Sequence, residues 1–209
     1  MTTLIDLSQK IQHSMPVYPG DSPVNLSRDR SLHTDGYTCF RLESNTHAGT
    51  HIDTPMHLTQ SASYVLDYPL EKFFGRGCLL DVRGEERIGY AEEYEEIVQE
   101  GDIVLVFTGR GETFLDRDYF KNYPAMEESL VRFLITRNIK LLGLDSPSPD
   151  RYPFDIHKIL FESGILIIEN LTNLDALLSA KSFEIMAFPL KIRADASPVR
   201  VVARIENAG

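Results

Sequence analysis

Apolar residues along this chain of 209 residues gather in short runs rather than in long stretches. Runs of about four to eight apolar and β-branched residues, bounded by turn-forming residues, are typical of β-strands. Eight segments fit this pattern and are predicted to be strands: Thr3–Leu7, Cys39–Glu43, Cys78–Val82, Ile103–Thr108, Lys140–Leu144, Ile165–Ile168, Glu184–Phe188 and Val199–Ile205.

Helical signals are fewer, and we predict helices over Ala91–Gln99, Ala125–Asn138 and Asp155–Phe161. The second segment carries apolar residues three or four positions apart, which form one face of a helix. Gly164 ends the third. Because strands are more numerous and do not alternate regularly with helices, the pattern predicts an α/β fold with a mixed β-sheet. No linker-like stretch divides the chain, so we expect a single domain over residues 1–209.

The formal net charge of −10 and the lack of any basic cluster argue against binding to the phosphates of nucleic acid. The longest apolar runs, such as Ile103–Phe107, fall far short of the ~20 residues that a membrane span needs. Cys39 and Cys78 are too few for a disulfide framework, and in apolar strands we expect them to be buried. The N-terminus has no signal-peptide pattern, so we expect a cytoplasmic protein. From the charge and the short apolar runs we expect neither a nucleic-acid nor a membrane partner.

Three of the six histidines lie within residues 47–57, together with a carboxylate. If the first part of this segment is extended, His47, His51 and Asp53 point to one face, because side chains alternate along a strand. Gly49 lies between them on that face, where its missing side chain leaves room for an ion. Imidazole and carboxylate ligands together are typical of sites for zinc, manganese or iron. The segment therefore predicts the metal site of a hydrolase.

His57 follows after a turn that Pro55 imposes, so it can reach back over the metal. An imidazole exchanges protons near neutral pH, which suits a general base that later acts as a general acid. The alternative is that His57 is itself a ligand. The sequence leaves both roles open.

A second pair of candidate ligands lies much further along the chain. Glu169 directly follows the predicted strand Ile165–Ile168, and ligands bind at the carboxyl ends of strands in open α/β sheets. His157 lies on the predicted helix before that strand. The residues alone leave open whether these two are ligands or an exposed strand end and a solvated helix face.

Two loops also follow predicted strands. We interpret Thr108–Gly111 as a structural turn, because so short a Gly-x-Gly is not a phosphate-binding loop. The prolines in Asp145–Pro149 restrain that loop, which we expect to lie at the same edge as Thr108 and to form a wall of the pocket. His13 and His33 have no neighbours at ligand spacing and are expected at the surface.

The run His-x-Gly-Thr-His-x-Asp-x-Pro-x-His resembles the signature of the cyclase-like metal hydrolase family, which includes bacterial kynurenine formamidase and isatin hydrolase. Four further segments also resemble this family: Pro16–Asp21, Leu66–Glu71, Phe188–Lys191 and Asp195–Arg200. The resemblance covers nearly the whole chain. It implies a swivelling β/β/α-like fold and an assembly of the chain into a homo-oligomer, either a dimer or a tetramer.

The resemblance also implies roles for individual residues. His47, His51 and Asp53 would be metal ligands, while His157 and Glu169 would complete a second metal position that Asp53 bridges. The cofactor would be one or two divalent ions, zinc or alternatively manganese. His57 would match the catalytic histidine of the family.

For the reaction, the resemblance implies hydrolysis of an N-formyl aryl amine, as in tryptophan catabolism, with Tyr18 as an aromatic wall for this small-molecule substrate. The alternatives are a cyclic amide, ester or lactone, or a metal-binding module without catalysis. Kynurenine formamidases usually carry a tryptophan in the segment matching Pro16–Gly20, whereas this chain has no tryptophan. The reaction class is therefore better supported than the substrate.

Overall fold

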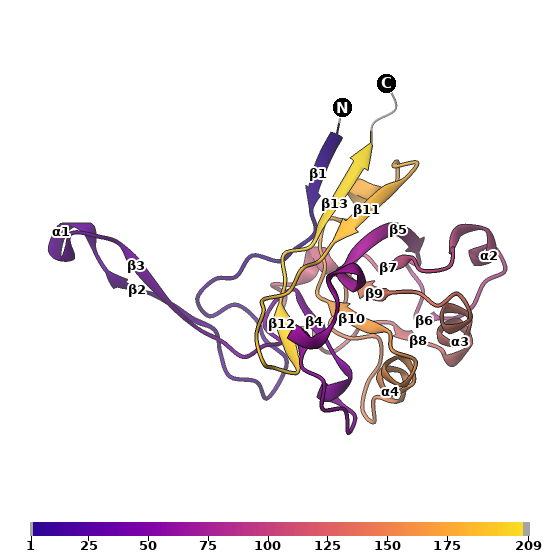
Figure 1. Cartoon of the computed structure of the whole chain (residues 1–209), viewed down its shortest axis with the longest axis horizontal. Coiled ribbons are helices and arrows are strands. Elements are labelled where there is room, and N and C mark those ends of the chain that lie inside the picture. The colour runs from indigo at the N-terminus through magenta and orange to yellow at the C-terminus, as the bar shows by residue number, and fades with distance from the viewer. Residues whose placement is uncertain (1, 207–209) are drawn as a thin grey trace.

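A nine-stranded mixed β-sheet organises the protein in the computed structural model, which describes residues 2–206 (Figure 1). The strands lie in the order β1-β13-β11-β5-β7-β9-β10-β4-β12. Their bounds are β1 Thr2–Asp6, β4 His51–Asp53, β5 Phe74–Asp81, β7 Ile103–Phe107, β9 Leu141–Leu144, β10 Leu166–Glu169, β11 Phe183–Met186, β12 Ala196–Pro198 and β13 Val202–Glu206. The predicted α/β class with a mixed sheet is confirmed.

The remaining elements are short. The α-helices are α1 Leu32–Asp35, α2 Tyr94–Ile97, α3 Glu128–Thr136 and α4 Asp155–Glu162, and two small sheets pair β2 (Asn25–Arg30) with β3 (Cys39–Glu43) and β6 (Arg87–Ile88) with β8 (Ala125–Met126). Single 3₁₀ turns cover Pro55–His57, Val65–Asp67, Leu70–Phe73, Arg110–Thr113 and Leu174–Leu177. Among the described residues, no helix is long and apolar enough to cross a membrane.

The central strands β5, β7, β9 and β10 run parallel to one another. Every residue of β7, β9 and β10 is buried, which explains why the sequence shows continuous apolar runs there instead of alternation. Helices α3 and α4 cover one face, over Val104 and Leu142. On the other face Leu105 and Ile168 share a core with Ile185 and Ala203 from the antiparallel strands, so the sheet curls over on itself.

The carboxyl ends of the parallel strands lie along the same edge of the sheet, and polar residues follow the strands at this edge. One carboxylate oxygen of Asp145, after β9, accepts hydrogen bonds of 2.7 Å from both the backbone and the hydroxyl of Thr108, after β7. Its other oxygen accepts bonds from the backbone N–H groups of Gly109 and Gly111. These bonds confirm that Thr108–Gly111 is a structural turn.

Strand β4 lies between β10 and β12 and pairs antiparallel with both. In this register His51 lies opposite Glu169, and Asp53 lies opposite Ala196. Three distant parts of the sequence therefore meet at the edge where the parallel strands end.

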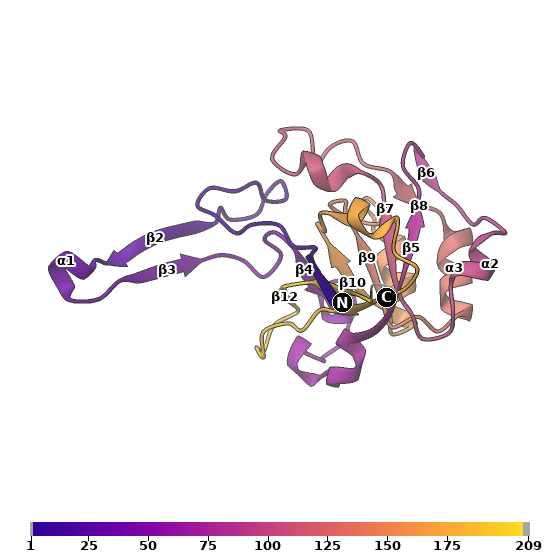
Figure 2. The same ribbon diagram turned by 90° about the horizontal axis from the view of Figure 1, so that it is seen from above.

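Strands β2 and β3 form a hairpin that extends away from the body of the protein, with α1 at its tip (Figures 1 and 2). The sequence pattern does not predict β2, because polar and charged residues occupy most of its positions. Every residue of β3 is exposed, so the expectation of a buried Cys39 is wrong, whereas Cys78 on β5 is buried. His33 is exposed on α1, and His13 is exposed as well, as expected.

Three predicted elements have different bounds in the structure. The helix over Ala91–Gln99 is reduced to α2, because glutamates four positions apart, Glu92 and Glu96, repel one another, and Val98 has an extended conformation. The start of the Ala125–Asn138 segment is strand β8, which pairs with β6. The strand predicted over Val199–Ile205 begins later, as β13, because β12 ends at Pro198 and the chain then moves from pairing with β4 to pairing with β11 and β1.

Candidate metal centre

His51 and Glu169 form the base of the centre, because β4 and β10 place them opposite each other. His51 Nε2 lies 3.5 Å from Glu169 Oε2, and both side chains are buried. The ring nitrogen Nδ1 of His51 lies 2.9 Å from the carbonyl oxygen of Gly49. Because a carbonyl only accepts, Nδ1 donates this hydrogen bond, and Nε2 is the ring nitrogen that faces the centre.

The predicted extended conformation over residues 47–53 is wrong, since the strand covers only His51–Asp53. Gly49 has a φ of +67°, a left-handed conformation that glycine adopts without strain, and it turns the chain before the strand. His47 therefore enters the centre from this turn and not from a shared strand face. Gly49 serves the turn, and its carbonyl oxygen also accepts a hydrogen bond of 3.0 Å from Asn170 Nδ2.

The carboxylate oxygen Oδ1 of Asp53 lies at the middle of the cluster. It is 2.9 Å from His47 Nδ1 and 3.3 Å from His51 Nε2. Asp53 is only 1% exposed, yet Oδ1 accepts no aligned hydrogen bond. A buried polar atom without a partner costs about 1–3 kcal/mol, and more when it is charged. A divalent cation would satisfy this oxygen and both nitrogens, so the residues fit a metal ion.

His157 and Glu169 complete the cluster, and the alternative of exposed positions is excluded because both are buried. Helix α4 presents His157, whose Nε2 lies 3.3 Å from Glu169 Oε1. Asp150 lies 2.6 Å from the other ring nitrogen, Nδ1, and also accepts a hydrogen bond from the backbone N–H of Ile156. Asp150 thus orients the imidazole toward the centre, as carboxylates behind metal-bound histidines do.

His57 lies on the 3₁₀ turn Pro55–His57, which confirms the predicted turn at Pro55. Its ring centroid is 4.3 Å from that of His47 and 6.5 Å from that of His157. The potential ligand atoms fall into two groups that share Asp53, one with His47 and His57 and the other with His51 and Glu169; in each group they lie within 4.8 Å of one another. This geometry is compatible with either role for His57.

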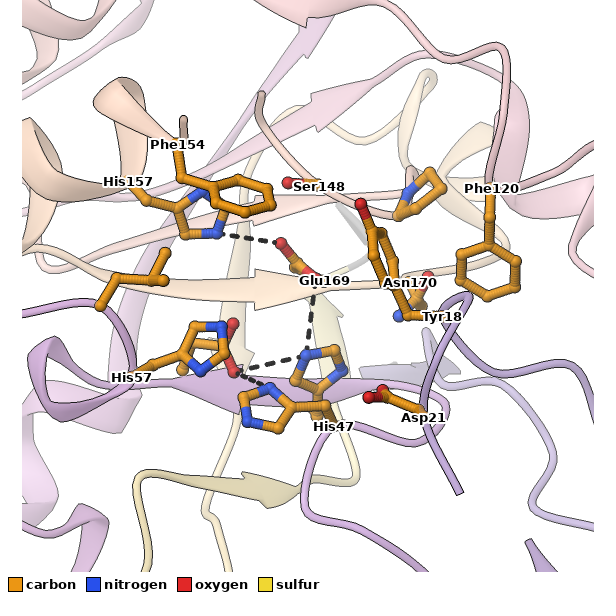
Figure 3. A pocket seen from close by; sticks show the side chains of 14 residues that line it. Tyr18, Asp21, His47, His57, Phe120, Ser148, Phe154, His157, Glu169 and Asn170 are labelled. Atoms are coloured by element: carbon orange, nitrogen blue, oxygen red, sulfur yellow. Dashed lines mark ion pairs between the residues drawn. The ribbon is translucent and has the colours of Figure 1, made fainter. Parts of the chain in front are cut away.

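The centre forms the floor of a cavity of about 230 Å³. Figure 3 shows His47, His57 and His157 arranged around Glu169, with Tyr18 and Phe120 on the other side of the cavity. The rings of Tyr18 and Phe120 meet edge to face, with centroids 5.9 Å apart. The remaining lining residues are Asp21, His51, Asp53, Leu58, Pro147, Ser148, Phe154 and Asn170. The expectation that Asp145–Pro149 forms a wall is confirmed through Pro147.

Sequence reasoning did not single out four residues that lie at the site: Asp150, Asp195, Phe120 and Phe154. Asp195 lies 2.9 Å from His47 Nε2, although 148 residues separate the two along the chain. No local pattern marks such residues, because their partners come from other elements. The one available signal was that Asp195 opens a segment resembling the family.

The carboxylates around the centre favour positive charge. Burial by itself lowers the pKa of His47, but Asp53 and Asp195 outweigh it and raise this pKa to about 10. Burial likewise opposes protonation of His157, and the carboxylates of Asp150 and Glu169 raise its pKa to about 10. The centre therefore attracts protons or a cation.

Metal binding should release protons from this centre. Imidazoles that bind a metal must be neutral. In the free protein, His47 and His157 are protonated at pH 7, because this pH lies below their pKa of about 10. Because the pKa of His51 is raised as well, against the effect of burial, by Asp53 and Glu169, we expect zinc to displace at least two protons and its apparent affinity to fall as the pH drops from about 8 to about 6. Calorimetric titration in buffers of different ionisation enthalpy counts the protons. Zinc binding without proton release would contradict the raised pKa values.

This chain is similar to known proteins over most of its length. The family model described as putative cyclase matches residues 5–151. A kynurenine formamidase of Bacillus mycoides (strain KBAB4) is 34% identical, over 96% of this chain and 96% of its own. A predicted metal-dependent hydrolase from Bacillus stearothermophilus has a TM-score of 0.80 at 26% identity, covering 98% of each chain. Isatin hydrolase A from Labrenzia aggregata shares the fold, with a TM-score of 0.87 at 22% identity over 99% of this chain and 94% of that one.

Proposed function

Because the chain belongs to the putative cyclase family, we propose that it is a metal-dependent hydrolase of a small amide, with an N-formyl aryl amine as substrate. The observation that carries this proposal is the convergence of His47, His51 and Glu169 on the unsatisfied oxygen of Asp53, at the floor of a cavity. The relatives named kynurenine formamidase make N-formylkynurenine the first substrate to test.

In this proposal His47, His51, Asp53, His157 and Glu169 hold one or two divalent ions, and zinc, with manganese as the alternative, suits this donor set. When bound, such an ion lowers the pKa of a water molecule and polarises the carbonyl of the substrate. The carboxylates of Asp53 and Glu169 balance the charge of the ion inside a buried site.

His57 moves the proton. It lies at the cavity, and its side chain is 32% exposed, so it can reach both water and substrate. It takes a proton as the water adds to the formyl carbon and returns that proton to the amine nitrogen as the C–N bond breaks. Without this proton the nitrogen would leave as an anilide anion, which is a poor leaving group. The products are formate and the free aryl amine.

The cavity wall supports an aromatic substrate. Tyr18 and Phe120 offer two ring surfaces against which an aryl group packs. Asp21 adds a carboxylate, and among the described residues no lysine or arginine lines the cavity. A substrate with an ammonium group complements such a lining. N-formylkynurenine carries an ammonium group beside its carboxylate, whereas isatin carries neither, so Asp21 offers the former substrate a contact to its ammonium group.

The test is hydrolysis of N-formylkynurenine and, in parallel, of isatin by protein loaded with zinc or with manganese. Absorbance of the aniline product follows the first reaction, and loss of isatin absorbance follows the second. We expect metal-dependent turnover of N-formylkynurenine, abolished by EDTA and restored by the metal. A folded, metal-loaded protein that hydrolyses isatin alone would replace the formamidase assignment with that of a lactam hydrolase.

We also propose that the protein forms a homo-oligomer, a dimer or a tetramer, through the β2–β3 hairpin. Leu26 pairs with Leu42 and Arg28 pairs with Phe40, so these residues share one face of the hairpin. Phe40 is 54% and Leu42 is 53% exposed. An isolated two-stranded hairpin is marginally stable in water, and a second copy of the chain would cover this face.

Light scattering coupled to gel filtration tests the assembly. We expect a dimer or tetramer for the wild type and a lower mass for the variant carrying Phe40→Ser and Leu42→Ser. Cys39→Ser, on the opposite face of the same strand, is the matched control and should keep the wild-type mass. A monomeric wild type would overturn the proposal.

A further inference from the structure

Asp195 contacts two of the imidazoles at the cavity through a single carboxylate oxygen. Its Oδ2 lies 2.9 Å from His47 Nε2 and 3.3 Å from His57 Nδ1. Its other oxygen, Oδ1, accepts a hydrogen bond of 3.3 Å from the hydroxyl of Thr46. One side chain thus links a proposed metal ligand to the proposed proton-transfer residue.

The backbone holds Asp195 in place independently of its side chain. The carbonyl oxygen of Asp195 accepts hydrogen bonds from the backbone N–H of Thr54 at 3.0 Å and from its hydroxyl at 2.7 Å. The next residue, Ala196, begins β12 and pairs with Asp53 of β4. Because these contacts use main-chain atoms of Asp195, replacing its side chain leaves them available.

The contacts of Asp195 select the tautomers of both rings. A carboxylate oxygen only accepts hydrogen bonds, so the facing nitrogens, His47 Nε2 and His57 Nδ1, carry hydrogens. Once metal binding has displaced the second proton of His47, the lone pair of its Nδ1 faces the point where the proposed metal ligands converge, 2.9 Å from Asp53 Oδ1. The lone pair of His57 Nε2 is free to accept a proton.

We propose that Asp195 is a positioning residue of the reaction, which fixes His47 and His57 in the tautomers that metal ligation and proton transfer require. This inference rests on the proposed function. The carboxylate of Asp195 acts through the two imidazoles and does not itself touch the substrate. Its polar contacts are with Thr46, His47 and His57, and its side chain is 33% exposed, so its loss leaves the buried core intact.

The kinetic test compares Asp195→Asn and Asp195→Glu in the zinc-loaded enzyme. An amide presents an N–H or an oxygen, so Asn no longer enforces one tautomer, whereas Glu keeps the carboxylate. We expect Asp195→Asn to lower kcat by about 10–100-fold with little change in KM, and Asp195→Glu to recover part of that loss. Asp67→Asn removes one negative charge at an exposed position on the turn Val65–Asp67 and should match the wild type.

A double-mutant cycle with His57→Ala separates positioning from a general loss of structure. If Asp195 acts through His57, Asp195→Asn should lower the residual kcat of the His57→Ala enzyme far less than it lowers that of the wild type. Equal losses in both backgrounds would overturn the proposed link to His57. If Asp195→Asn binds less zinc but keeps the wild-type kcat per bound zinc, Asp195 positions only His47, and its proposed role toward His57 is overturned.

A measurement without substrate keeps this inference distinct from the proposed function. Two-bond ¹⁵N–¹H correlation spectra of the zinc-loaded, ¹⁵N-histidine-labelled protein show which ring nitrogen of His57 carries the hydrogen. We expect the Nδ1–H form in the wild type and a mixture in Asp195→Asn. A wild type in the Nε2–H form would overturn the role of Asp195 even if the enzyme is active. An inactive protein with the Nδ1–H form would instead overturn the proposed function.

Discussion

Replacing His57 with alanine should lower kcat by about 10²–10⁴-fold, the range typical of a lost general acid–base. His57 lies on a short turn at the cavity, and its side chain is partly exposed, so its removal disturbs little packing. The loss should fall on kcat and leave KM nearly unchanged, because proton transfer contributes in the transition state and not to substrate binding. Steady-state kinetics of the zinc-loaded enzyme with N-formylkynurenine measures both constants.

The zinc content of the same variant decides between the two roles that the sequence left open. If His57 transfers protons, His57→Ala should bind zinc as the wild type does. If it is a ligand beside His47 and Asp53, zinc affinity should fall together with kcat. His13→Ala, at an exposed histidine outside the cavity, is the matched control and should change neither. An unchanged kcat in His57→Ala would exclude both roles.

Replacing Asp53 with asparagine should abolish both metal binding and activity. Asparagine has nearly the same size, so packing is kept, but a neutral amide cannot balance a divalent ion. Both groups of candidate ligands share Asp53, so its loss affects both metal positions at once. We expect less than about a hundredth of the wild-type zinc affinity. Elemental analysis after dialysis measures bound zinc, and circular dichroism confirms the fold.

Asp145→Asn is the matched control for Asp53→Asn, since Asp145 is equally buried at the same edge of the sheet. Its carboxylate binds backbone N–H groups and the Thr108 hydroxyl, and it does not face the metal centre. We expect this variant to lose stability by about 1–3 kcal/mol and still to bind zinc. Full zinc occupancy in Asp53→Asn would refute the proposed centre.

The residues most readily predicted are those whose surroundings are local. The apolar runs of β7, β9 and β10 predict buried parallel strands, and the periodicity of Asp155–Phe161 predicts α4 almost to its ends. The composition of residues 47–57 predicts a metal site, because ligand types concentrated in one segment need no knowledge of the fold. For His157 and Glu169, the resemblance to a known family supplied what spacing could not, and the structure brings them together.

The sequence by itself determined the strand and helix types in the centre of the fold and the chemical nature of the cluster, because both depend on neighbours within a few residues. Only the tertiary structure decided that His47 enters from a turn at Gly49, which local alternation cannot indicate. It also decided that Asp195 lies beside His57, 138 residues away along the chain, since that contact depends on the pairing of β12 with β4. Side-chain periodicity is a local property of the backbone, whereas hydrogen-bond partners follow from strand pairing, which the whole core selects.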